Sequence, residues 1–136
     1  MAQFPLGWPK KDIWAGYPEQ RDELLDHVTS GISGVLFLSG DHHFGSLHRV
    51  ETTGARKDLW EILAGPGAST PNPLVAAVEL APELAETTTP KNQFEYTSVH
   101  HAATFLTFNP AEKTVTVRFV DAETEATSFE RTLTFS

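Results

Sequence analysis

The residues of this chain best suited to chemistry stand together in the tetrapeptide Gly40-Asp41-His42-His43. A carboxylate and an imidazole so close in sequence can point into one cavity, and divalent metals accept such oxygen and nitrogen donors. The tetrapeptide alone is a weak signal, because loop histidines are often solvated and an aspartate after glycine is a common turn residue. Metal ligation, a solvated loop and a turn are therefore all open interpretations.

A short apolar run over residues 34–39 ends directly before this tetrapeptide. An uninterrupted apolar run of this length is typical of a strand that is covered on both faces. In layered α/β folds, ligands bind just beyond the carboxyl ends of central strands. We therefore expect the polar residues after Ser39 to lie at the end of a central strand.

A helix is predicted before this strand, over about residues 18–29. Pro18 suits the first helical position, the acidic residues that follow favour the positive end of the helix dipole, and Gly31 supplies a stop. Residues 1–13 are expected to form an irregular entry segment, since Pro5, Gly7 and Pro9 interrupt any period.

The remaining elements are mostly strands. Residues 47–52 are expected to form a strand or a turn, and residues 59–64 a short strand. Residues 68–100 are expected to be an insertion over the site or the sheet edge, with a helical stretch near 74–84 that Pro82 interrupts. Alternation of apolar and polar residues over 114–119, with further strands near 103–108 and 129–135, predicts an antiparallel β-meander at the C-terminus.

Composition narrows the function classes. The 136 residues suffice for one domain, and a formal net charge of -8 disfavours binding to nucleic acid or anionic membranes. The chain has no cysteine, which excludes disulfides, thiolate metal sites and a cysteine nucleophile. No apolar run approaches the ~18 residues of a membrane helix, and no signal peptide is expected at the N-terminus.

Serine hydrolase chemistry has no support in the sequence. No serine stands in a Gly-x-Ser-x-Gly elbow, and Ser46 has no evident base and orienting group nearby in the sequence. Trp60 is expected in the core, and residues 65–69 are expected to form a turn, because they lack the Gly-Lys-Ser/Thr ending of a phosphate-binding loop.

Two motifs in order carry a more specific signal. Trp14-x-Gly16-Tyr17-Pro18-x-x-Arg21 precedes the helix, and Leu38-Ser-Gly-Asp-His-His-Phe44 ends the apolar strand. With the closing β-meander, this arrangement resembles the PhoD-like alkaline phosphatases and phosphodiesterases, a branch of the calcineurin-like metallophosphoesterases. The resemblance is strong over residues 12–45 and looser over residues 59–136.

The resemblance implies an α/β fold and a metal site. Residues 1–136 would form a single domain, the C-terminal portion of a PhoD-like domain, equivalent to half of a four-layer α/β/β/α sandwich. Asp41 and His43 match the positions that supply metal ligands, and His42 would support those ligands from behind without binding the metal, or would contact a phosphate. Trp14 and Tyr17 would be pocket-wall or packing residues. Iron, manganese, zinc and calcium all suit such donors.

The other histidines and Arg21 leave alternatives open. His48 lies five residues beyond His43, and either reaches the same cavity or occupies a solvent-facing strand position. His100 and His101 precede a strand, where adjacent side chains point in opposite directions, so at most one of them, with His101 as the candidate, reaches the site. His27 is expected at the helix end as a structural residue. Arg21 either forms an ion pair on the helix surface or neighbours the site, and the surface position is the favoured expectation.

The implied activity is hydrolysis of phosphate mono- or diesters by metal-activated water. The family draws most of its metal ligands from an N-terminal half, and this sequence does not recreate that pattern, so we expect little or no activity from the isolated chain. The alternative is a non-catalytic metal-binding or protein-interaction domain that retains half of the fold. An exposed sheet edge would then favour a homo-oligomer or a partner chain. Relatives are often periplasmic or secreted, and localisation stays open.

Overall fold

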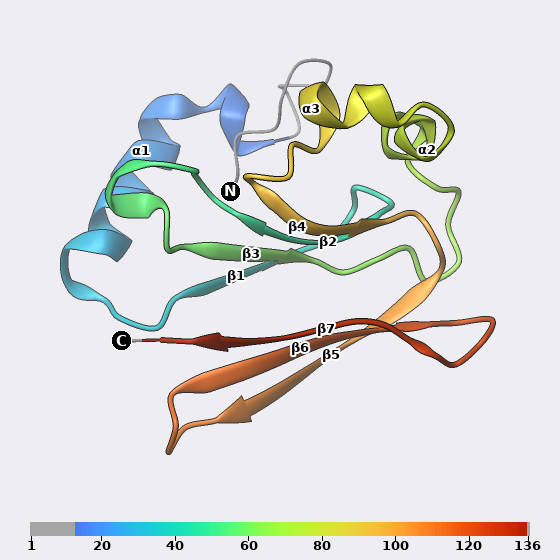
Figure 1. Cartoon of the computed structure of the whole chain (residues 1–136). Coiled ribbons are helices and arrows are strands. Elements are labelled where there is room, and N and C mark those ends of the chain that lie inside the picture. Colours follow the sequence, from blue (N-terminus) through green and yellow to red (C-terminus); the bar gives the residue numbers. More distant parts are fainter. Residues whose placement is uncertain (1–12, 136) are drawn as a thin grey trace.

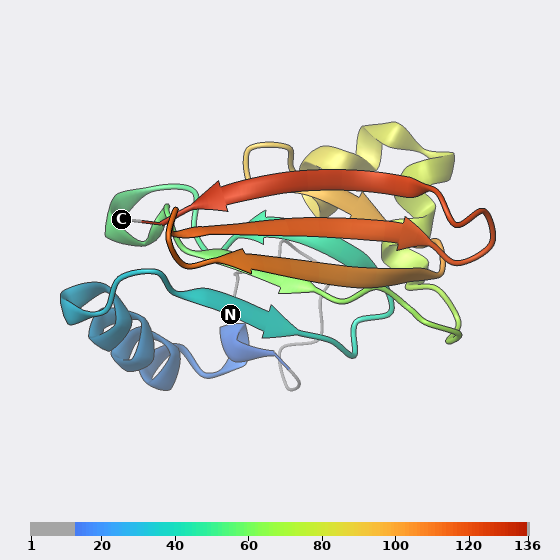
Figure 2. The same ribbon diagram turned by 90° about the horizontal axis from the view of Figure 1, so that it is seen from below.

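Two β-sheets lie face to face in the computed structural model, which describes residues 13–135 (Figure 1). The entry segment expected over residues 1–13 lies outside this range except for Ile13, and so does the N-terminus examined for a signal peptide. Helices cover one face of the first sheet, and the second sheet packs against its other face (Figures 1 and 2). The structure is therefore of the mixed α/β class that the sequence predicted.

The helix before the first strand is confirmed. After a short 3₁₀ turn, η2 (Trp14–Gly16), helix α1 spans Pro18–Gly31 with its proline at the start. Leu25 and Val28, at a spacing of three residues, are buried on one face of α1. The helix ends when Ile32 turns to extended backbone, with its N–H still bonded to the carbonyl of Val28 at 3.3 Å.

The first sheet is mixed and has the strand order β1-β3-β2-β4. Its strands are β1 (Leu36–Ser39), β2 (Gly45–Arg49), β3 (Trp60–Leu63) and β4 (Phe94–Ser98). β1 and β3 are parallel, whereas β2 is antiparallel to both β3 and β4. The carboxyl ends of β1 and β3 therefore meet at one end of the sheet.

The prediction that the strand before Gly40 is central and covered on both faces is wrong. β1 lies at the edge of the mixed sheet and pairs only with β3 among the described strands. Its Leu38 side chain is 61% exposed, and Leu36 is only partly buried. An apolar run reports the tendency of a segment to form a strand, but strand order depends on pairings between segments distant in the sequence.

The prediction that residues 68–100 form an insertion is correct only in part. The helical stretch is present as α2 (Pro73–Leu80), followed by η4 (Pro82–Leu84) and α3 (Ala85–Thr88). Residues 94–98, however, form β4, which pairs with β2 as an integral strand of the mixed sheet. The pairing of β4 with β2 is irregular between Leu47 and His48. β4 is five residues long and contains no apolar run, so it carries no clear strand signal in the sequence.

The second sheet is the predicted antiparallel meander. It contains β5 (Ala102–Asn109), β6 (Thr114–Asp121) and β7 (Thr127–Thr134), with β6 in the centre. Val115, Val117 and Phe119 alternate inward and form a buried cluster with Leu47, Trp60 and Ile62 of the mixed sheet. Trp60 is thus a core residue, as expected. This cluster joins the two sheets.

The helices and two sheets form three layers (Figures 1 and 2). Within residues 13–135, no helix lies on the outer face of the antiparallel sheet, so the four-layer arrangement stays a prediction. In the same range, none of the helices combines the length and the apolar character needed to cross a membrane.

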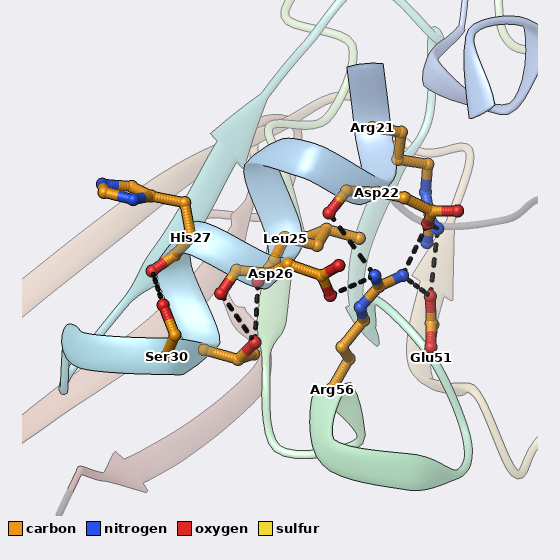
Figure 3. Close-up of polar contacts among 9 residues, drawn as sticks. Arg21, Asp22, Leu25, Asp26, His27, Ser30, Glu51 and Arg56 are labelled. Carbon is orange, nitrogen blue, oxygen red and sulfur yellow. Dashed lines mark hydrogen bonds and ion pairs between the residues drawn. The ribbon is translucent and has the colours of Figure 1, made fainter. Parts of the chain in front are cut away.

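An ion-pair cluster ties α1 to the loop between β2 and β3, where η3 (Gly54–Arg56) lies (Figure 3). Arg56 contacts Asp22 and Asp26 of the helix at 2.6 Å each, and it also contacts Glu51 at 3.1 Å. Glu51 accepts a further hydrogen bond from Arg21 at 3.0 Å. The expectation of a surface position for Arg21 is wrong, because its side chain is buried beneath the helix, although it does form an ion pair.

Candidate functional site

The loop of residues 40–43 follows β1, and we call it the site loop. It holds the candidate metal ligands at the end of the sheet where β1 and β3 terminate. Asp41 and His43 are both exposed, and both adopt left-handed backbone conformations, with φ of 72° and 57°. Non-glycine residues adopt such conformations rarely and at an energetic cost, so the surrounding contacts must hold them. The loop therefore depends on its neighbours for its shape.

His43 is oriented by a backbone carbonyl. Its Nδ1 lies 2.7 Å from the carbonyl oxygen of Thr70, which can only accept a hydrogen bond. Nδ1 therefore carries the hydrogen, and in the neutral ring Nε2 keeps a free lone pair that faces away from this contact. Metal-binding histidines are commonly held in this way, with one ring nitrogen donating to a carbonyl.

The segment that contains Thr70 also contacts His101. The Nε2 atom of His101 lies 3.1 Å from the carbonyl oxygen of Ser69, the residue next to Thr70. The structure thus brings the two predicted histidines, His43 and His101, to consecutive carbonyl groups of one loop. His100 is exposed, in agreement with the expectation that at most one of the pair points inward.

Asn72 joins this loop to helix α2, and sequence reasoning missed it. Its side-chain amide donates to the carbonyl of His42 at 2.9 Å, and its backbone N–H donates to the carbonyl of His43 at 2.9 Å. Its Oδ1 accepts from the amides of Leu74 and Val75 as the N-cap of α2. An asparagine before a proline is a helix-start signal, and it could have been recognised as a cap but not as a clamp on the site loop.

His42 is half-buried and packs edge-on against the ring of Phe44. Burial lowers the pKa of His42, and the nearby carboxylates of Asp41 and Glu61 oppose this shift without cancelling it. The imidazole is therefore mostly neutral at pH 7. The support of the metal ligands by His42, or its contact with a phosphate, stays a prediction.

His48 belongs to a chain of four hydrogen-bonded side chains, which we call the buried chain: Ser46, His48, Glu61 and Ser39. Ser46 lies 2.8 Å from His48 Nδ1, and His48 Nε2 lies 3.2 Å from Glu61 Oε2. The other oxygen of Glu61 accepts from the Ser39 hydroxyl at 2.6 Å. His48 is fully buried, so its solvent-facing alternative is wrong, and Ser39 connects the chain to the site loop.

Glu61 is ionised within this chain. Burial by itself would raise the pKa of its carboxyl group, whereas the hydrogen bond from His48 lowers it, and the resulting pKa lies below its usual range. A carboxylate with both oxygens accepting hydrogen bonds satisfies its charge, as buried ionised groups require. Sequence reasoning missed Glu61, because it is a lone acidic residue inside an apolar strand.

The buried chain contains a serine, a histidine and a glutamate in series, although the sequence suggested no base or orienting group for Ser46. This connectivity is that of a hydrolase triad. Ser46 and His48 are nevertheless both 0% exposed, so a substrate cannot reach the hydroxyl. We therefore assign no nucleophilic role to Ser46 or to any other member of the buried chain.

Trp14 and Tyr17 lie on and directly after η2, with 40% and 50% of their surfaces exposed. Their neighbours Ile13 and Ala15 pack in the core cluster that contains Phe44, which directly follows the site loop. The packing of Ile13 and Ala15 against this cluster holds the Trp-x-Gly-Tyr-Pro segment at the start of α1. A contribution of the two exposed rings to a pocket wall stays a prediction.

The donor types of this loop fit a divalent metal, but their number does not complete a site. An exposed carboxylate at Asp41 and the oriented imidazole of His43 are suitable ligands for zinc, manganese or iron. Across residues 13–135, however, no group of three or more histidine, aspartate or glutamate side chains is arranged to hold an ion. No catalytic step can therefore be assigned to a metal held by these residues alone.

Comparison with known protein families identifies one relationship. The model of the PhoD-like phosphatase family matches residues 8–119, a span that includes the site loop, the buried chain, the whole mixed sheet, and β5 and most of β6 in the antiparallel sheet. No curated protein and no solved structure matches the chain. Because the family model covers most of its length, the chain belongs to the PhoD-like phosphatase family.

Proposed function

We propose that this chain is a segment of a metal-dependent phosphoesterase that hydrolyses phosphate mono- or diesters with metal-activated water. Asp41 and His43 are its two metal ligands in this proposal. The family match over residues 8–119 supports the reaction class. The orientation of His43 by the Thr70 carbonyl supports the assignment of its Nε2 as a donor.

The chain contributes only part of the site in this proposal. When bound, a divalent ion polarises a phosphoryl oxygen and lowers the pKa of water, and each ion requires several donors. The remaining donors come from polypeptide beyond residues 13–135, and the two sheets form the C-terminal half of a four-layer sandwich. Residues 1–136 then belong to a single domain, and the isolated chain has little or no activity.

The function of this chain's own residues in such a site follows from their chemistry. His43 presents a neutral nitrogen donor, and Asp41 presents a negative oxygen donor whose exposure permits access of a metal and a phosphate group. His42 is the candidate contact for the substrate phosphate. Iron, manganese, zinc and calcium remain the candidate ions.

A non-catalytic binding domain is the second candidate, and the incomplete donor set favours it. The open edge of β1, with the exposed Leu38 side chain, supports a partner that covers this edge, in a homo-oligomer or a complex. In that case the same loop binds one metal weakly or none.

Calorimetric titration of the purified chain with Mn²⁺, Zn²⁺ and Ca²⁺ tests the proposal. We expect the wild type to bind one of these ions and both Asp41→Ala and His43→Ala to lose at least about tenfold in affinity, because each removes a direct ligand. His27→Ala is the matched control, since His27 lies on α1 away from the loop, and it should bind as the wild type does. Hydrolysis of p-nitrophenyl phosphate esters is measured alongside.

The outcomes test the metal site, which the first candidate requires and the second allows only as a weak site or none. Binding that is lost in both loop variants places the metal at the end of β1, and turnover by the chain alone would contradict the expectation of inactivity. Equal binding by wild type and both variants, or no binding of any ion, would contradict the metal site and favour the interaction domain.

A further inference from the structure

The C-terminal end of β1 is anchored twice at Ser39. The Ser39 hydroxyl donates to Glu61 Oε1 at 2.6 Å, and the Ser39 carbonyl accepts from the backbone N–H of Ala64 at 2.9 Å. Both partners belong to β3 or the residue that follows it. Since β1 is an edge strand, these contacts hold its end against the sheet from one side only.

The buried chain holds Glu61 in turn. A carboxylate only accepts hydrogen bonds, so His48 donates through Nε2, and its Nδ1 accepts from the Ser46 hydroxyl in the neutral ring. Glu61 is 2% exposed, and His48 is also stacked on Phe94 with ring centroids 4.9 Å apart. The carboxylate therefore has little freedom to move, and its contact with Ser39 is rigid.

Only Gly40 separates this anchor from Asp41. Asp41 adopts a left-handed conformation with φ of 72°, a conformation that persists only where the surroundings over-determine it. Asn72 restrains the far side of the loop through the carbonyls of His42 and His43. On the β1 side, the restraints are the two contacts of Ser39, of which only the one with Glu61 involves a side chain.

We propose that Glu61 is a positioning residue, which acts through the Ser39 hydroxyl to hold the loop of residues 40–43 with Asp41 and His43 ready to bind a metal. This inference rests on the proposed function, because it takes these two side chains as ligands. Glu61 itself does not touch the ion. It sets the direction in which the chain leaves β1.

Ser39→Ala and Ser39→Thr test this role as a matched pair. Alanine removes the hydroxyl that contacts Glu61, whereas threonine keeps a hydroxyl and suits a strand. We expect Ser39→Ala to weaken Mn²⁺ binding by about 10-fold or more, in the range found for groups that orient metal ligands. Ser39→Thr should restore the wild-type affinity, and both proteins should unfold at similar temperatures.

Glu61→Gln and Ser46→Ala extend the test along the buried chain. Glu61→Gln removes the charge at nearly constant volume, so its remaining oxygen accepts a weaker hydrogen bond from Ser39, and Mn²⁺ binding should fall, though by less than in Ser39→Ala. Ser46→Ala leaves the contact between Ser39 and Glu61 in place but removes the hydroxyl that donates to His48, so it should weaken Mn²⁺ binding by less than Ser39→Ala does. If Glu61→Gln does not fold, the Ser39 pair decides the question.

A readout without metal separates this inference from the proposed function. NMR order parameters of residues 40–43 should fall from about 0.85 towards 0.6 in Ser39→Ala, and the amide of Ala64 should exchange faster, whereas Ser39→Thr should change neither. These changes support the positioning role even if the wild type binds no Mn²⁺. The absence of Mn²⁺ binding would contradict the ligand role of Asp41 and His43 but not the role of Glu61 in holding the loop. If neither the order parameters nor the Mn²⁺ affinity changes in Ser39→Ala, the positioning role of Glu61 is overturned.

Discussion

Glu61 is a buried carboxylate whose two oxygens both accept hydrogen bonds. One carboxylate oxygen accepts from Ser39 and the other from His48, and the pKa of Glu61 lies below its usual range, where burial alone would have raised it. A lowered pKa means that the folded state stabilises the charged form. The contribution of Glu61 to stability therefore depends on pH in a defined direction.

In the unfolded chain the pKa of a glutamate is about 4.3. The stability that Glu61 contributes should be present above this pH and should be lost as the pH falls below it. Below that value the unfolded chain binds a proton that the folded protein still excludes, so unfolding becomes easier. Urea denaturation from about pH 6 to about pH 3 measures this, with the Glu61→Gln variant as the reference.

The free energy of unfolding should decrease towards low pH more steeply in the wild type than in Glu61→Gln. Other carboxylates contribute equally to both curves, so their difference isolates Glu61. Parallel curves for the two proteins would contradict an ionised Glu61 in the buried chain.

At the scale of elements, helix α2 and the site loop are linked through Asn72, which caps the helix and contacts the carbonyls of His42 and His43. The start of α2 and the loop are thus held by one residue, through both its side chain and its backbone N–H. A change at Asn72 is therefore expected to affect both elements, and the two effects can be separated chemically.

Asn72→Ala should cost about 1 kcal/mol or more, because the cap of α2 is lost together with the contact to the loop. Asn72→Asp keeps an acceptor for the amides of Leu74 and Val75 but loses the donor to the His42 carbonyl. We expect the aspartate variant to retain most of the stability in urea denaturation while the NMR order parameters of His42 and His43 fall. Equal loss of stability in both variants would show that the cap is not the main contribution.

At the scale of the whole molecule, stability depends on the contact between the two sheets. Leu47 of the mixed sheet is 0% exposed and packs in the cluster with Val117 and Phe119 of the antiparallel sheet. The chemistry of the site loop depends on this packing because β2 and β3, which carry His48 and Glu61, are held between the helices and the second sheet.

Leu47→Ala should lower the free energy of unfolding by about 2–5 kcal/mol, because it leaves a cavity between the sheets. Leu80→Ala is the matched control: Leu80 is 89% exposed at the end of α2 and should change stability by less than about 0.5 kcal/mol. Urea denaturation of both variants measures the difference, and similar values would contradict the core assignment.

Local signals by themselves predicted a large part of this protein. Pro18 and Gly31 bracket α1, alternating residues mark β6, and the Trp-x-Gly-Tyr-Pro and Gly-Asp-x-His motifs indicated the PhoD-like family that the comparison shows. These signals succeed because caps, turns and periodicity act over a few neighbouring residues. The same kind of local motif indicated Asp41 and His43 as metal ligands, and that role stays a prediction.

Only the tertiary structure decided which strand lies at the edge, where His48 points and what holds the site loop. β1 looked central because its apolar run carries no information about its neighbours, and Arg21 looked exposed because its partner Glu51 is 30 residues away. Glu61 and Asn72 gave no chemical signal in the sequence, since their contacts to Ser39 and His42 join segments that are distant along the chain. Hydrogen bonds of this kind arise only when long-range packing brings their partners together.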